Sequence, residues 1–135
     1  MEINIKELQE VIASRGGRKT PRFTLSKGGY FNVNNAYKEQ NDIKNKNSIN
    51  MKAIRKADKL IVAISFHEKE EDGSFKLTLN GKSKSSWFSG RSLFSQFGLD
   101  FKELVPKGKT IKLKPNIQNS EGVRYFIIEI SIPKK

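Results

Sequence analysis

Two stretches of similar pattern decide how the chain is expected to fold: GGYFNVNNAYKEQN at residues 28–41 and SSWFSGRSLFSQFGLD at residues 85–100. Each stretch holds an aromatic pair, Tyr30-Phe31 or Trp87-Phe88, followed by small polar residues and a run with helical spacing. Aromatic residues favour strands, and a glycine such as Gly98 commonly ends a helix. The pattern predicts that the second half of the chain repeats the order of elements in the first half.

The segments around these two stretches predict further strands. KLIVAISFHE at residues 59–68 is a continuous apolar run, which indicates a central strand, and the alternating FKLTLN at residues 75–80 predicts its hairpin partner. Residues 110–115 and 123–132 also predict strands. INMKAIRK at residues 49–56 predicts one or two helical turns, with Ile49, Met51 and Ile54 facing inward, and NIQNSEG at residues 116–122 predicts a turn.

The fold class predicted from these elements is α+β. A small bent sheet or barrel would be built from two related strand-helix-strand-strand halves, residues 23–80 and 83–132, within a single compact domain at 23–135. An N-terminal amphipathic helix is predicted at residues 1–14, where Ile5, Leu8 and Ile12 recur at helical spacing. A basic linker or arm with glycines and a proline follows at residues 15–22.

The charge of the chain indicates a polyanionic partner. Lysine and arginine number 26 against 14 acidic residues, which gives a formal net charge of +12. Such an excess is typical of nucleic-acid-binding proteins, although a lysine-rich composition without a binding role would give the same charge. Cysteine is absent, and no run is apolar enough to span a bilayer. We therefore expect a cytoplasmic protein without a membrane partner, of a size and composition that fit a phage or plasmid accessory protein.

The sequence carries no catalytic signature. The only histidine, His67, stands beside Glu68 and Glu70, without the spacing of a metal-binding helix. The acids at 68–72 form one contiguous turn, whereas a metal-dependent nuclease needs carboxylates that converge from separate elements. We expect no enzyme activity, no metal and no cofactor.

Basic residues interleaved with aromatic residues predict the binding site. A cationic groove with stacking rings is typical of proteins that bind single-stranded nucleic acid, and Trp87 and Tyr30 are the candidate rings. No helix presents a reading face, so we expect low sequence specificity and favour single-stranded DNA over duplex DNA or RNA. An alternative is a protein-interaction module or inhibitor that docks on an acidic partner. The candidate nucleic-acid-binding residues are Arg15, Arg18, Lys19, Arg22, Lys27, Tyr30, Lys82, Lys84, Trp87, Arg91, Lys107, Lys109, Lys112 and Lys114.

The segment KADKLIVAIS at residues 56–65 resembles the strand that follows the short helix in swapped-hairpin barrel proteins, a bacterial family of transition-state regulators and antitoxins. The resemblance implies DNA binding by a basic barrel face. The arginine-rich first strand of the family is matched here only by Arg22 and Lys27. Family members are dimers of one unit, whereas this chain would carry both units itself, and the resemblance leaves a homodimer open.

Overall fold

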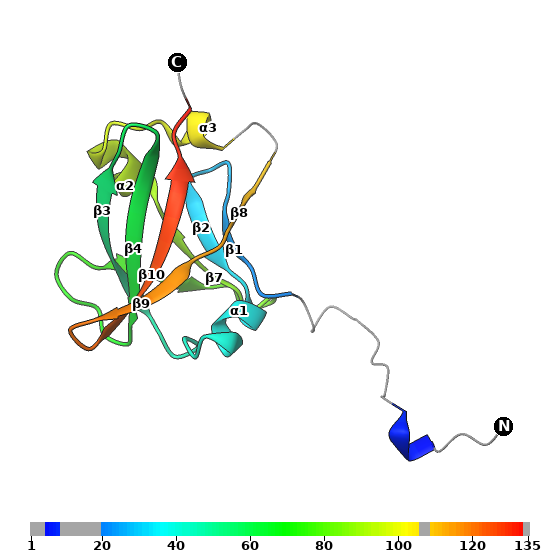
Figure 1. Ribbon diagram of the computed structural model, residues 1–135. Coiled ribbons are helices and arrows are strands. Elements are labelled where there is room, and N and C mark those ends of the chain that lie inside the picture. The colour runs from blue at the N-terminus through cyan, green and yellow to red at the C-terminus, as the bar shows by residue number, and fades with distance from the viewer. Residues whose placement is uncertain (1–4, 9–19, 106–108, 134–135) are drawn as a thin grey trace.

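The computed structural model describes residues 5–8, 20–105 and 109–133. The fold is α+β and consists mainly of two five-stranded antiparallel sheets packed against each other, with a few short helices (Figure 1). The described strands form two separate sheets, so the expected single bent sheet or closed barrel is corrected to a two-sheet arrangement.

The first sheet has the strand order β6-β7-β2-β1-β8. Its strands are β1 (Phe23–Leu25), β2 (Tyr30–Val33), β6 (Thr78–Leu79), β7 (Ser86–Ser89) and β8 (Ile111–Leu113). The β1–β2 hairpin turns at Gly29, whose φ of +82° suits glycine. The second sheet has the order β5-β3-β4-β10-β9. Its strands are β3 (Ser48–Arg55), β4 (Lys59–His67), β5 (Phe75–Lys76), β9 (Asn116–Ser120) and β10 (Val123–Ser131).

Short helices cover the two ends of the sheets. Helix α1 (Asn35–Gln40) lies at one end, and α2 (Arg91–Gln96) and α3 (Phe101–Leu104) lie at the other (Figure 1). Asn34 caps α1, because its side chain accepts a hydrogen bond from the Tyr37 backbone N–H. Gly98 follows α2 with a φ of +68°, as expected of a residue that ends a helix. No helix in the described ranges is long and apolar enough to cross a membrane.

The N-terminal helix predicted at residues 1–14 is described only in part. The structure has a single 3-10 turn, η1 (Ile5–Glu7), whose apolar side chain Ile5 is exposed, as is the neighbouring Leu8. Because both side chains are exposed, neither packs on the core formed by the described residues. Residue Ile12 and the basic arm up to residue 19 lie outside the described residues.

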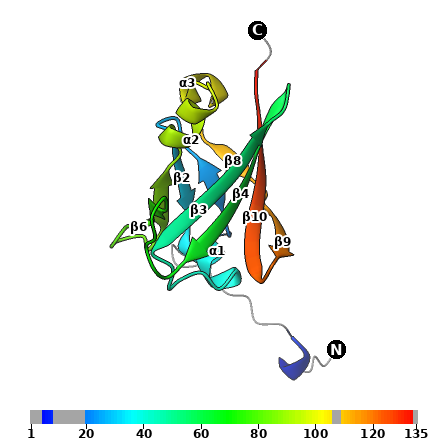
Figure 2. The same ribbon diagram turned by 90° about the vertical axis from the view of Figure 1, so that its left-hand side faces the viewer.

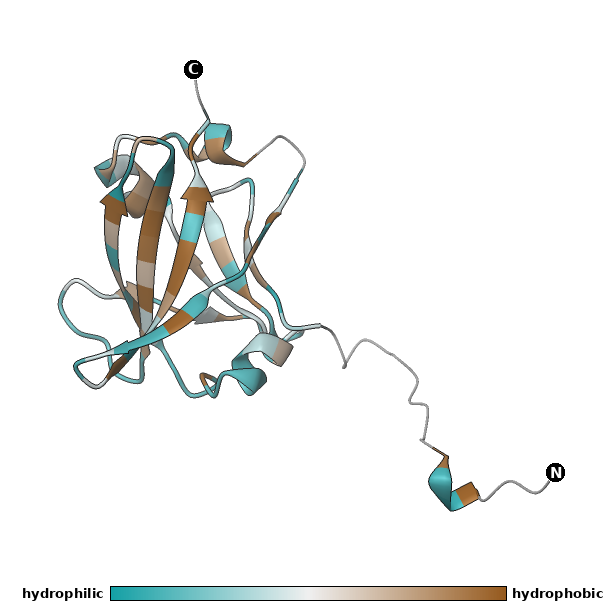
Figure 3. Cartoon of the chain, in the orientation of Figure 1, coloured by the Kyte–Doolittle hydropathy of each residue, from teal (hydrophilic) through white to brown (hydrophobic). Residues whose placement is uncertain are grey.

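The core lies between the two sheets and follows the alternation of each strand. Phe23, Leu25, Phe31 and Phe88 face inward from the first sheet. The second sheet contributes Leu60, Val62, Ile64, Phe126, Ile128 and Ile130. Figure 3 shows the matching hydrophobic colour along β4 and β10. Gly90 lies so close to the Phe31 ring that an added Cβ would stand 2.5 Å from the Phe31 Cε2 atom.

Each half of the chain contributes strands to both sheets. Strand β2 pairs with β7 at the middle of the first sheet, where Phe31 is opposite Phe88. Strand β4 pairs with β10 in the second sheet, where Ala63 is opposite Ile127. The strands β3, β4 and β10 of the second sheet run side by side in Figure 2.

Three predicted elements are corrected by the structure. Residues 48–55 form β3 rather than helical turns: Ile49, Met51 and Ala53 face the core at a spacing of two, while Ile54 is 51 % exposed. Residues 116–120 form the edge strand β9 rather than a turn. The hairpin expected over residues 59–80 is absent from the described strands, since β5 pairs with β3 and β6 pairs with β7.

Candidate nucleic-acid interface

One row of outward-facing residues crosses all five strands of the first sheet. Lys112 is paired with Thr24, Thr24 with Asn32, Asn32 with Trp87, and Trp87 with Thr78. Their neighbours along each of the longer strands point into the core, so the row lies on the outer face. This outer row carries a cation at one side, an amide in the middle and an indole ring beside the amide.

A groove of about 750 Å³ lies on one side of the outer row. None of its described lining residues is acidic, and the polar ones supply only cations, amides and hydroxyls. We call this site the basic groove, and it is lined by Arg22, Thr24, Asn32, Asn34, Asn35, Ala36, Lys82, Ser83, Lys84, Ser85, Thr110 and Lys112. Such a lining suits a ligand that carries several negative charges.

Backbone hydrogen bonds hold the basic residues at the edge of the groove. The turn between β6 and β7 is fixed by Asn80, whose side-chain oxygen accepts from the Lys82 N–H and whose carbonyl accepts from the Lys84 N–H. Lys84 adopts a φ of 58°, which is uncommon for lysine. On the other side, the Arg22 N–H donates to the side-chain oxygen of Asn34 at 2.9 Å. Segments far apart in sequence therefore bring their cations to one groove.

An aromatic cluster extends the same face beyond Trp87. The Tyr30 and Trp87 rings meet edge to face with centroids 5.3 Å apart, and Trp87 is 37 % exposed. The Arg91 guanidinium lies 5.1 Å from the Tyr30 ring centroid and 5.0 Å from that of Phe101. Its Nε atom donates to the Gly28 carbonyl at 2.9 Å. Arg91 is thus held in place with part of its guanidinium fork still exposed, which suits a phosphate contact.

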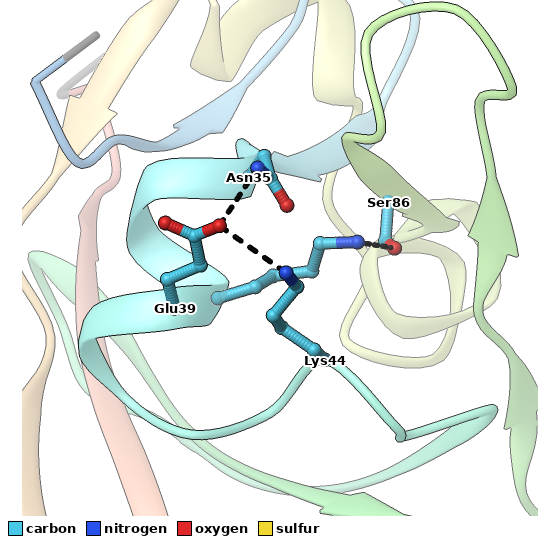
Figure 4. Close-up of polar contacts among 5 residues, drawn as sticks. Asn35, Glu39, Lys44 and Ser86 are labelled. Carbon is cyan, nitrogen blue, oxygen red and sulfur yellow. Dashed lines mark hydrogen bonds and ion pairs between the residues drawn. The ribbon is translucent and has the colours of Figure 1, made fainter. Parts of the chain in front are cut away.

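A buried lysine stands behind the basic groove. Lys38 is only 3 % exposed, and its Nζ atom donates a hydrogen bond of 2.9 Å to the hydroxyl oxygen of Ser86. Among the described residues, no ion pair involves Lys38. Asn35 donates to Glu39, while its own buried Oδ1 atom has no hydrogen-bond partner in the described structure and is turned toward Ser86 (Figure 4).

Two pKa shifts follow from this arrangement. Burial lowers the pKa of Lys38, and the nearby positive charge of Lys44 lowers it further. Glu39 has its pKa lowered in turn, chiefly by the hydrogen bond from Lys44 at 3.2 Å. The positive charge of Lys38 therefore adds to the field behind the groove without being neutralised by a carboxylate of its own.

Replacement of Ser86 by alanine is expected to lower the free energy of unfolding by about 1–3 kcal/mol, because the Lys38 ammonium loses its hydrogen-bond acceptor. In a Lys38→Met background the same replacement is expected to cost about 1 kcal/mol or less, since no buried charge is then left unpaired. Urea denaturation of the two single variants and the double variant measures this coupling. Additive effects would contradict the pairing of Lys38 with Ser86.

Stability is also expected to respond to pH through Lys38. The unfolded chain holds the lysine proton more tightly, so the contribution of Lys38 to stability rises with pH from its lowered folded pKa up to the ordinary value of 10.5. Burial raises the pKa of Tyr37 to about 12, which takes stability away above its ordinary value of 10.0. The difference between wild type and Lys38→Met cancels the Tyr37 contribution. We expect the unfolding free energy of wild type minus that of Lys38→Met to rise as the pH rises toward 10.5.

The structure brings together half of the predicted binding residues. Arg22, Lys82, Lys84 and Lys112 line the basic groove, and Tyr30, Trp87 and Arg91 form the aromatic cluster. Lys27 and Lys109 are exposed elsewhere, and Lys114 lines a separate cleft between β8 and β10. Arg15, Arg18, Lys19 and Lys107 lie outside the described residues. Groove residues that sequence reasoning missed are Thr24, Asn32, Asn34, Asn35, Ala36, Ser83, Ser85 and Thr110.

The outer face of the second sheet is more apolar. Ile54 is paired with Ile61 on this face, and Ala63 is paired with Ile127. None of these four side chains belongs to the described core. This face therefore differs in character from the basic groove on the first sheet.

The acidic residues do not form a metal centre within the described ranges, where no group of three His, Asp or Glu residues could hold an ion. A ring nitrogen of His67 lies 2.7 Å from the Ser65 hydroxyl, and the cleft beside it is lined by Lys46 and Arg124.

Comparisons with protein-family models, with curated proteins and with solved structures found no match to the chain.

Proposed function

We propose that the chain is a non-enzymatic, cytoplasmic nucleic-acid-binding protein of low sequence specificity, and that its ligand is single-stranded DNA. One observation carries this proposal: the outer row joins the basic groove to the aromatic cluster on a single sheet face. The phosphates would lie along the cations of the groove, and bases would stack at Trp87. Phosphate contacts of this kind read no sequence, which gives low specificity.

Single strands are favoured over duplexes because of the position of Trp87. Its ring lies within the sheet face, paired on both sides by neighbouring strands, and only 37 % of the residue is exposed. A base can reach such a ring only when it is unpaired and turned toward the protein. In a duplex the bases stay stacked inside the helix, and the ligand would gain only the phosphate contacts.

The proposal is tested by fluorescence anisotropy with labelled single-stranded DNA, duplex DNA and RNA at two salt concentrations, with Trp87 emission read in parallel. We expect the tightest binding to single-stranded DNA, with weaker binding at higher salt and quenching of Trp87. Absence of binding to all three ligands at low salt would overturn the proposal. Binding to duplex DNA with equal affinity and unchanged emission would overturn the stacking geometry.

A Trp87→Ala variant is expected to bind single-stranded DNA about 5- to 150-fold more weakly, corresponding to about 1–3 kcal/mol for one stacked base. The dependence of affinity on salt should stay unchanged, because no cation is removed. Trp87→Phe is the control, since it keeps an aromatic ring and should retain part of the affinity. An unaltered dissociation constant for Trp87→Ala would rule out stacking at this residue.

We also infer that the two halves of the chain are duplicated units with the strand arrangement of swapped-hairpin barrel proteins. The inference is supported by the central pairs β2–β7 and β4–β10, each formed by one strand from either half. Family members are dimers of one unit, whereas here both units would lie within one chain. Light scattering tests this, with a monomer expected and a homodimer as the contrary result.

A protein-interaction module is the second candidate function, favoured by the outward-facing Ile54–Ile61 pair on the second sheet, in which Ile54 is exposed and Ile61 is half-buried. An acidic partner with apolar side chains could cover this pair while its charges meet surrounding lysines such as Lys52. Ile54→Lys would then weaken the partner complex and leave the affinity for single-stranded DNA unchanged. The two candidates are thus separated by the sheet face that each uses.

A further inference from the structure

We propose that Asn32 reads the edge of the base that stacks at Trp87, and that it selects adenine at this position. This inference rests on the proposed function, because it concerns the strand bound by the basic groove. Asn32 is the residue of β2 whose Cα is paired with that of Trp87 on β7. Side chains directly opposite each other on one face have Cβ atoms about 4.5–5.5 Å apart, so the amide lies beside the stacking ring.

The hydrogen bonds of the groove single out Asn32 among its three amides. Asn34 is fully engaged, since its oxygen accepts from the Arg22 and Tyr37 N–H groups and its amide nitrogen donates to the Thr20 carbonyl. Asn35 donates to Glu39, and its oxygen is buried.

Asn32 is the remaining amide, and it is partly exposed with no side-chain hydrogen bond in the described structure. A donor and an acceptor are therefore both free beside Trp87. An asparagine amide matches the adjacent donor and acceptor of adenine N6 and N7. The ring of adenine, a purine, also offers a large surface for stacking on the indole.

The neighbours of Asn32 supply the rest of the contact. Thr24 and Lys112 continue the outer row on one side and place a cation where the phosphate next to the base would lie. Thr78 flanks Trp87 on the opposite side, and its hydroxyl is the alternative to Asn32 for a hydrogen bond to the stacked base. The outer row thus places the side chains that would contact the phosphate, the edge of the base and the face of the base in one line across the sheet.

The experiment uses the full chain and short single-stranded DNAs. Every nucleotide of these strands is abasic except the central one, which carries a single base. Anisotropy and Trp87 quenching are measured for each of the four bases and for the all-abasic strand. We expect wild type to bind the adenine strand about 5- to 150-fold more tightly than the thymine strand. Asn32→Leu, which keeps the side-chain size, should remove this difference while Trp87 is still quenched.

Thr78→Val is the matched control, because it alters the other neighbour of Trp87 in the same row and should keep the adenine preference. Equal affinities of wild type for all four bases, with quenching, would overturn the role of Asn32 and leave the proposed function standing. Loss of the adenine preference in Thr78→Val but not in Asn32→Leu would also overturn it. If no strand binds, or the all-abasic strand binds as tightly as the others, the proposed stacking site itself fails.

Discussion

Replacement of Phe88 by alanine is expected to lower the free energy of unfolding by about 3–5 kcal/mol. Phe88 is fully buried, and its ring stacks on that of Phe31 with centroids 5.0 Å apart and planes 20° from parallel. The Phe23 ring meets it edge-on at 6.2 Å. Alanine would leave a cavity where the two halves of the first sheet join, and the surrounding rings could fill it only in part.

Urea denaturation followed by circular dichroism measures this loss. The control is Leu79→Ala on the edge strand β6, where the side chain is 60 % exposed and the expected cost is about 0.5 kcal/mol. Phe88→Leu keeps most of the volume and should cost about 1–3 kcal/mol, so it gives a measurable transition if the alanine variant does not fold. Equal costs for Phe88→Ala and Leu79→Ala would contradict the central position of Phe88.

Removal of the four groove cations is expected to weaken binding of single-stranded DNA roughly a thousandfold at about 50 mM salt. Each phosphate contact on a single strand contributes a slope of about −0.7 to the dependence of log affinity on log salt. Four contacts should contribute about −2.8 to this slope, and the variant should lose that contribution. The variant carries glutamine at Arg22, Lys82, Lys84 and Lys112.

The matched control removes the same number of positive charges from exposed positions outside the groove. It carries glutamine at Lys56, Lys69, Lys102 and Lys109. Both variants have the same net charge, so anisotropy titrations over a range of salt separate a local site from general attraction to a basic protein. An equal loss of affinity in the two variants would show that charge, and not the basic groove, governs binding.

Strands with their own apolar alternation could be predicted from the sequence, and strands defined by a partner could not. Residues 59–67 and 123–131 alternate or are continuously apolar, and they form strands as expected. Strand β9 is exposed along its whole length, and its conformation comes from the ladder with β10. Strand β3 was not predicted because the outward Ile54 breaks the apolar spacing of two, and because Asn50, Lys52 and Ala53 have little preference for strands.

The candidate site could be predicted by residue type but not by position. Charge pointed to Lys82, Lys84 and Lys112, yet only the order of strands shows that β8 lies beside β1 and brings Lys112 to the groove. Asn32 was not singled out, because an asparagine in a short strand has no distinctive local pattern. Its relation to Trp87 depends on the register between β2 and β7, which joins residues far apart in the chain.

The interlocked order of strands has a consequence for how the protein is made. Strand β1 finds its partner β8 only after residues 111–113 have been synthesised, and β4 likewise waits for β10. At about 5–20 residues per second, the first half spends several seconds on the ribosome with its apolar faces uncovered. Contacts between such distant residues also make closure slow. The nascent first half is therefore the stage at which the apolar faces of β1 and β4 are most open to aggregation.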